Sequence, residues 1–153
     1  MKTLKNQVLS LALIFCCIIS SAQVTRINEP DLSKPKLFQN QPTDILVNPV
    51  QLESLMDFQV GQEVNLSLGT GFQFQGHVVS TASKYENSIQ SIVIASSNYQ
   101  GARLTISKLT HPDKGVTYTG RIMSFKHGDL YELTSRNNQY YFEKKKLYDL
   151  VNE

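Results

Sequence analysis

The chain has 153 residues, 15 of them basic and 13 acidic, with a formal net charge of +2 and two cysteines. Both cysteines and two of the lysines lie in the first 22 residues, so removal of that segment would leave 13 basic residues, 13 acidic residues and no cysteine. Such a chain has no disulfide, thiolate nucleophile or cysteine metal site. Its neutral charge offers no argument for an anionic membrane as a partner, and we expect no nucleic acid partner.

The first 22 residues have the three parts of a secretory signal peptide. Lys2 and Lys5 form the positive region, residues 8–19 are apolar with one interruption, and Ser20 and Ala22 stand at the −3 and −1 positions of a cleavage site. The apolar stretch is shorter than the ~20 residues that span a bilayer. We therefore predict a cleaved signal peptide (1–22), export to the periplasm or beyond the cell, and no membrane span in the mature chain. The alternatives are an uncleaved anchor and a lipoprotein acylated at a cysteine.

The next segment, residues 23–48, is polar, contains three prolines and shows no periodicity, which predicts a flexible polar arm. A short helix is expected to follow, because Asn48 can cap it and Pro49 suits its first position. Apolar residues at i, i+3 and i+4 from Leu52 would give that helix one buried face. The folded domain is thus predicted to span residues 49–153.

From Glu63 onward, apolar and polar residues alternate, as expected of strands with one buried face. The turn sequences between these segments include "HPDKG" (111–115) and "RNNQ" (136–139), where Gly and Asn tolerate positive φ. The pattern predicts an all-β domain: a single antiparallel meander of about seven strands, closed as a small barrel or folded as a sandwich. The alternating apolar residues are Val64, Leu66, Leu68, Phe72, Phe74, Val78, Ile92, Ile94, Leu104, Ile106, Val116, Tyr118 and Ile122.

The last predicted strands carry the candidate binding residues, which are two tyrosines and a run of three lysines. Tyr131 and Tyr141 are predicted as aromatic contacts for a partner, and the alternative is partial burial in the core. The lysine run would contact an acidic partner or keep an edge strand from pairing with other chains. One mechanism is strand addition along an edge at residues 139–146. The predicted binding residues are Tyr131, Tyr141, Lys144, Lys145 and Lys146.

Catalytic, cofactor and metal motifs are not found in the sequence. The three histidines, His77, His111 and His127, are far apart and form no H-E-x-x-H cluster. The chain has no G-x-S-x-G elbow and no phosphate-binding glycine loop followed by a helix. His127 and Asp129 could form an acid–base pair, but adjacent Gly and Asp residues are typical of a turn. We therefore assign no catalytic, cofactor-binding or metal-binding residue.

Three consecutive segments resemble a known family. They are "FQFQGHVVS" (72–80), "SIQSIVIASSNYQGARLTIS" (88–107) and "YTGRIMSFKHGDLYEL" (118–133). Their succession is similar to the β-rich propeptide module that precedes the catalytic domain of secreted reprolysin-like zinc metallopeptidases, over about residues 72–142. The resemblance implies a free-standing module that binds or restrains a peptidase by surface contact.

The predicted function is therefore that of a secreted or periplasmic, non-enzymatic binding module, propeptide-like or inhibitor-like, with a protein partner such as a secreted peptidase. Two alternatives stay open. One is a carbohydrate- or envelope-binding β domain that stacks tyrosines on sugars. The other is a small hydrolase whose site is assembled from loops.

Overall fold

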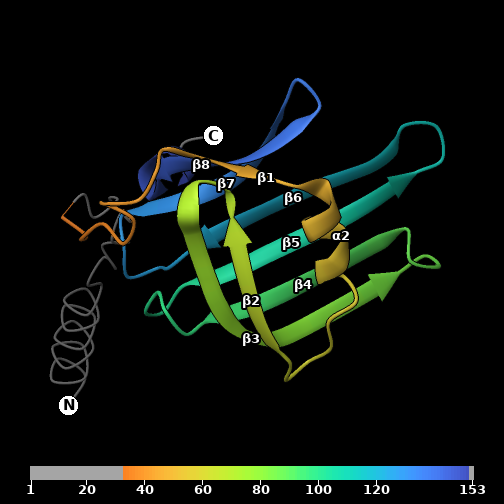
Figure 1. The fold of residues 1–153 in the computed structure, drawn as a ribbon, viewed down its shortest axis with the longest axis horizontal. Helices are drawn as coiled ribbons and strands as arrows, with labels where there is room; N and C mark the ends of the chain where they lie inside the picture. The colour runs from red at the N-terminus through yellow and green to blue at the C-terminus, as the bar shows by residue number, and fades with distance from the viewer. Residues whose placement is uncertain (1–32, 152–153) are drawn as a thin grey trace, which may run out of the picture.

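The computed structural model describes residues 33–151, so the predicted signal peptide and residues 23–32 lie outside the described residues. Its elements are β1 (Asp44–Val47), α2 (Pro49–Leu55), β2 (Glu63–Leu68), η1 (Gly69–Gly71), β3 (Phe72–Lys84), β4 (Ile89–Ser96), β5 (Arg103–His111), β6 (Gly115–Met123), β7 (Asp129–Arg136), β8 (Gln139–Lys146) and η2 (Leu147–Val151). The prediction of an all-β domain with one short α-helix is confirmed (Figure 1). No helix between residues 33 and 151 is long and apolar enough to cross a membrane.

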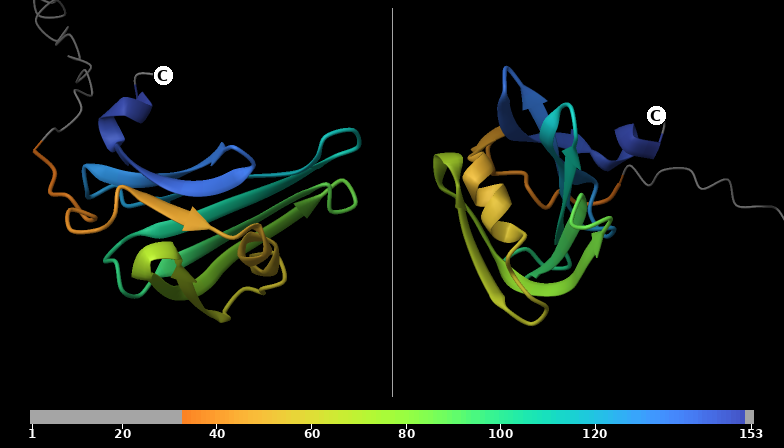
Figure 2. Two further views of the ribbon diagram at one scale, coloured as in Figure 1. Left: turned by 45° about the horizontal axis from the view of Figure 1, so that its top comes forward. Right: turned by 90° about the vertical axis from the view of Figure 1, so that its right-hand side faces the viewer.

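The described strands form one antiparallel sheet in the order β1-β8-β7-β6-β5-β4-β3-β2. Strands β2 to β8 pair with their neighbours in sequence, as a meander does. The sheet curls until its two edges approach each other. The closeness is seen at Gly69 in η1, where an added Cβ would lie only 2.8 Å from the carbonyl oxygen of Leu46 in β1. The fold is therefore a small, nearly closed barrel rather than a two-sheet sandwich (Figure 2).

The barrel interior is filled by the side chains that alternate along the strands. In β5 and β6, for example, Leu104, Ile106 and Ile122 are fully enclosed while Thr105 and Thr119 face outward. Gly76 allows β3 and β4 to approach, since an added Cβ would lie 2.2 Å from the Ala95 carbonyl oxygen. The predicted period of two is confirmed, with the exception of Val116, which is exposed.

Helix α2 lies across the mouth of the barrel (Figure 2). Its start is as predicted: the Asn48 side chain accepts a hydrogen bond from the backbone N–H of Val50 at 2.9 Å, and Pro49 occupies the first position. Leu52 and Leu55 are buried among the core residues. The helix therefore closes one end of the barrel with its apolar face.

The predicted boundary between arm and domain at residue 49 is wrong for the described residues. Residues 44–47 form β1, which pairs with β8 and buries Ile45 and Val47. Before it, residues 34–43 cross the other end of the barrel, and Phe38 is completely enclosed. We call residues 34–43 the N-terminal strap. A single buried aromatic and a four-residue strand produce no periodicity in the sequence, which is why this segment resembled a linker.

Candidate functional site

Strand β8, which carries most of the predicted binding residues, is not an edge of the sheet. It lies between β7 and β1, with Tyr140 opposite Val47 and Glu143 opposite Asp44. The pairing continues one residue further, because the backbone N–H of Lys144 donates to the Thr43 carbonyl oxygen at 2.8 Å. Strand addition at residues 139–146 is therefore corrected: β1 already occupies the position that a partner strand would take.

Tyr131 and Lys144 lie inside the barrel end and hold the N-terminal strap. Tyr131 is fully buried, and its hydroxyl donates to the Pro42 carbonyl oxygen. Lys144 Nζ donates to the carbonyl oxygens of Phe38, at 2.7 Å, and Gln41. It lies 5.9 Å from the centroid of the Tyr131 ring. Burial raises the pKa of the Tyr131 phenol. Tyr131 is therefore corrected from a surface contact to a core residue.

Asp129 completes the set of groups that hold the strap. Its buried carboxylate accepts hydrogen bonds from the backbone N–H groups of Leu37, at 2.6 Å, and Phe38, at 2.9 Å. His127 has a different partner, because its Nδ1 lies 3.0 Å from Ser124 Oγ. Within the described residues, no hydrogen bond joins His127 to Asp129. The His-Gly-Asp sequence thus joins a turn to the first residue of β7, Asp129, whose carboxylate binds main-chain groups.

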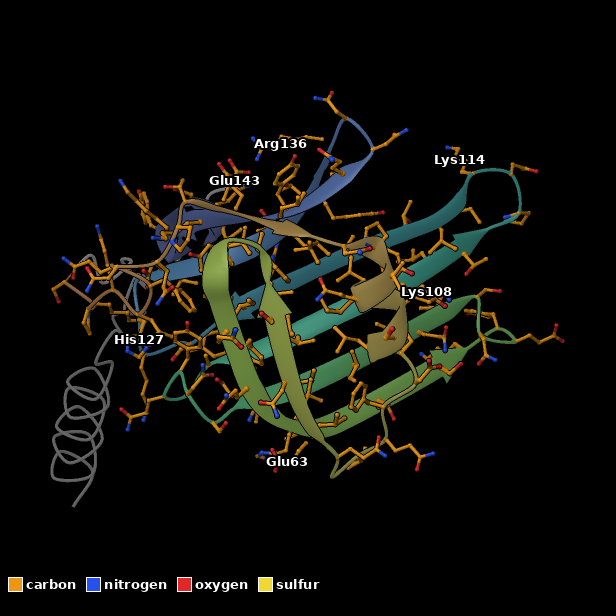
Figure 3. All side chains as sticks on the ribbon, in the orientation of Figure 1. Glu63, Lys108, Lys114, His127, Arg136 and Glu143 are labelled. Atoms are coloured by element: carbon orange, nitrogen blue, oxygen red, sulfur yellow. The ribbon has the colours of Figure 1, made fainter. Side chains whose placement is uncertain are left out.

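Tyr141 lies on the outer face of the barrel and is half-buried. Its hydroxyl donates to Gln139 Oε1 at 2.7 Å, and the guanidinium of Arg136 lies 4.7 Å from the centre of its ring. Arg136 also pairs with Asp44 at 2.8 Å. Figure 3 shows Arg136 near Glu143, with His127 apart from both. The three lysines diverge as well: Lys144 is inside, Lys145 pairs on the outer face and Lys146 is exposed. They do not form one basic patch.

A three-residue ion-pair network links β6, β7 and β8 on the outer face. Glu132 Oε1 accepts from Arg121 Nη2 at 2.8 Å and from Arg121 Nε at 3.1 Å, while Glu132 Oε2 accepts from Lys145 Nζ at 2.7 Å. Partial burial of Glu132 acts to raise its pKa. The hydrogen bonds from Lys145 and Arg121 outweigh this effect and hold the pKa of Glu132 below its usual value. The network carries two positive charges and one negative charge.

Immediately beyond this network, β6 and β7 separate. Their pairing is limited to Arg121 with Glu132, Ile122 with Tyr131, and Met123 with Leu130. By contrast, β5 and β6 pair along the whole of β6, and β7 and β8 pair along the whole of β7. In the part of the chain that the structure describes, residues 115–120 of β6 and residues 133–136 of β7 therefore have no strand partner on their facing sides. Figure 1 shows the β7–β8 hairpin diverging from β6.

A surface groove of about 490 Å³ lies where the two strands separate, and we call it the β6–β7 groove. It opens on the outer face, because its Ser and Thr side chains alternate with the buried residues of β5 and β6. From the inner side, Tyr140 reaches under the separation: its hydroxyl accepts from the backbone N–H of Tyr118 at 3.1 Å. The groove is lined by Thr105, Ser107, Thr119, Gly120, Arg121, Met123, Glu132 and Leu133.

A second polar cluster, at the mouth of the barrel, joins α2 to the opposite wall. The Glu53 carboxylate accepts from Lys108 Nζ on β5 and from the Tyr118 hydroxyl on β6. Hydrogen bonds from Lys108 and Tyr118 hold the pKa of Glu53 below its usual value, while desolvation and then Glu53 raise the pKa of Tyr118. Figure 3 shows Lys108 beside α2. This cluster anchors the helix, and sequence reasoning missed it because its members are 10 to 65 residues apart.

Neither the groove nor the clusters hold a recognisable metal site: among residues 33–151, no three His, Cys, Asp or Glu side chains gather in a way that could hold an ion. Comparison with protein families, curated proteins and solved structures finds no match to this chain. The resemblance to a peptidase propeptide therefore stays a prediction. The β6–β7 groove is the candidate functional site, because it combines an open surface with strand edges that lack partners within the described chain.

Proposed function

We propose that the chain is an exported, non-enzymatic binding module that captures an extended polypeptide segment of a partner protein. The observation that carries this proposal is the separation of β6 and β7, which leaves two strand edges facing each other beside a groove. An edge presents N–H and C=O groups that the backbone of an added strand complements, and this is how strand addition produces affinity.

The partner class is a secreted peptidase, as the resemblance to propeptide modules implies. Such a module would restrain its partner through surface contact. A thiolate that occupies a catalytic zinc is not part of the proposal, because the chain beyond residue 22 contains no cysteine.

The two alternative functions have less support from the geometry. Sugar stacking by the two predicted tyrosines needs open aromatic faces, but Tyr131 is enclosed and Arg136 covers the ring of Tyr141. A loop-assembled hydrolase needs a base held by an orienting group. The nearest candidates, His127 and Asp129, have separate partners, namely Ser124 and the backbone of the N-terminal strap.

The proposal is tested by selection of a random 12-residue peptide library on phage against the chain purified from the exported fraction. We expect enrichment of extended, proline-poor sequences, and loss of binding when alternate backbone nitrogens of a selected peptide are methylated. Mass spectrometry of the peptide after incubation should recover it intact. Failure to enrich any peptide, binding confined to a glycan array, or cleavage of the peptide would overturn the proposal.

A further inference from the structure

The free edge of β6 presents backbone groups in a known direction. The N–H of Tyr118 points away from β5, since it donates to the Tyr140 hydroxyl. Backbone groups of a strand alternate in direction with a period of two, and the β5–β6 register is regular here. The N–H and C=O groups of Val116 and Gly120 therefore face the same side. Residues 116–120 form an edge about 16 Å long, at ~3.3 Å per residue.

Tyr140 fills part of the place of a missing strand. Its ring packs edge-on against Tyr118, with centroids 5.5 Å apart at an angle of 82°. Its hydroxyl accepts a hydrogen bond from the N–H of Tyr118 at the centre of the edge. In a paired strand, a carbonyl oxygen of the partner would accept that hydrogen bond instead. Rotation of the Tyr140 side chain is enough to release the Tyr118 N–H, whereas release of a paired strand would require the whole strand to separate. The edge is thus both satisfied in isolation and available to a partner.

An exposed arginine, Arg121, lies at the closed end of the groove. Arg121 and Lys145 share the single carboxylate of Glu132. The side chain of Arg121 is 47% exposed, and only two of its five N–H donors serve Glu132. A second carboxylate placed over the end of β6 would meet these remaining donors in a charge-assisted, bidentate geometry. The remaining lining consists of four small residues and two larger apolar ones: Thr105, Ser107, Thr119, Gly120, Met123 and Leu133.

We infer that the groove takes an acidic, extended segment of another protein, paired along residues 116–120 of β6, with a carboxylate of that segment on Arg121. The inference rests on the proposed function and names its site and the chemistry of the partner segment. Recognition is mainly through the backbone, so a range of sequences binds, and the acidic residue sets the register.

The test measures the affinity of a selected peptide that contains Asp, and of the same peptide with Asn, for four variants. Val116→Pro removes one N–H from the free edge of β6 and keeps the β5–β6 ladder. Affinity should therefore fall about tenfold, because one peptide carbonyl is left without a donor. Val116→Ala keeps that N–H and should change affinity less than about twofold. Arg121→Gln should weaken the Asp peptide about tenfold and leave the Asn peptide unchanged.

Tyr140→Phe gives a result that simple damage to the fold would not produce. Removal of the hydroxyl exposes the Tyr118 N–H, so peptide affinity should rise by about fivefold while the melting temperature falls slightly. If peptides bind and neither Val116→Pro nor Tyr140→Phe alters their affinity, the proposed function holds and the site is elsewhere. If no peptide binds, both fail. A dimer in sedimentation, abolished by Val116→Pro, would make a second copy the occupant and overturn the assignment to another protein.

Discussion

Replacement of Phe38 by alanine should destabilise the whole barrel, although this residue precedes every strand. The Phe38 side chain is completely enclosed, and its ring lies 4.8 Å from Tyr131, 5.3 Å from Tyr99 and 6.3 Å from Phe72. Truncation of a buried phenylalanine to alanine typically lowers the free energy of unfolding by about 3–5 kcal/mol. Against a total of ~5–15 kcal/mol for a domain, this is a loss of about a fifth or more. The melting temperature should fall by roughly 10–20 °C.

Urea denaturation followed by circular dichroism measures the effect. The matched control is Lys36→Ala, two residues earlier in the N-terminal strap: Lys36 is exposed, so its replacement should change the free energy of unfolding by less than ~0.5 kcal/mol. A loss below about 1 kcal/mol for Phe38→Ala would show that the strap is not part of the folded core. In that case the polar contacts of Asp129 and Lys144 with the strap would also be without energetic effect.

Three further predictions concern packing and pH. Gly76→Ala should lower the free energy of unfolding by about 1–3 kcal/mol in urea melts, because its Cβ would lie 2.2 Å from the Ala95 carbonyl oxygen. Glu53 has a pKa below its usual 4.5, so its ionised form stabilises the fold above that pH and the stabilisation is lost on acidification. The difference in melting temperature between wild type and Glu53→Gln should therefore close as pH falls below about 4.5. Tyr131 has a raised pKa, so its neutral form stabilises the fold up to the usual value of 10.0 and the stabilisation is lost as pH rises further. In thermal melts above pH 10, the melting temperature of Tyr131→Phe should therefore fall less with pH than that of wild type. An equal fall in the two proteins would contradict this.

Local sequence patterns predicted most strands and turns correctly, because their causes are local. The alternation of Ile92 with Ile94 and of Leu104 with Ile106 requires one buried face, and all four side chains are enclosed. The turn at Asn137 and Asn138 was predicted from the tolerance of asparagine for left-handed geometry, and both residues have positive φ, 52° and 60°. Helix α2 begins at the predicted cap and proline.

The N-terminal strap and the role of Tyr131 could not be predicted in this way. The strap is held by side chains about 90 to 106 residues away, such as Asp129 and Lys144, and no spacing rule connects residues so far apart. Tyr131 shares its inward face with Lys144 only because of the β7–β8 register. A tyrosine in a short strand fits either face equally well until that register is known.

By itself, the sequence determined the class of fold, the positions of the strands after residue 63, and the absence of thiol chemistry beyond residue 22. The tertiary structure decided which strands are edges, because the β1–β8 pairing closes one predicted edge and the end of β6–β7 pairing opens another. The physical reason is that alternation reports only which face of a strand is buried. Which neighbour supplies its hydrogen bonds depends on the twist and closure of the whole sheet, to which every strand contributes.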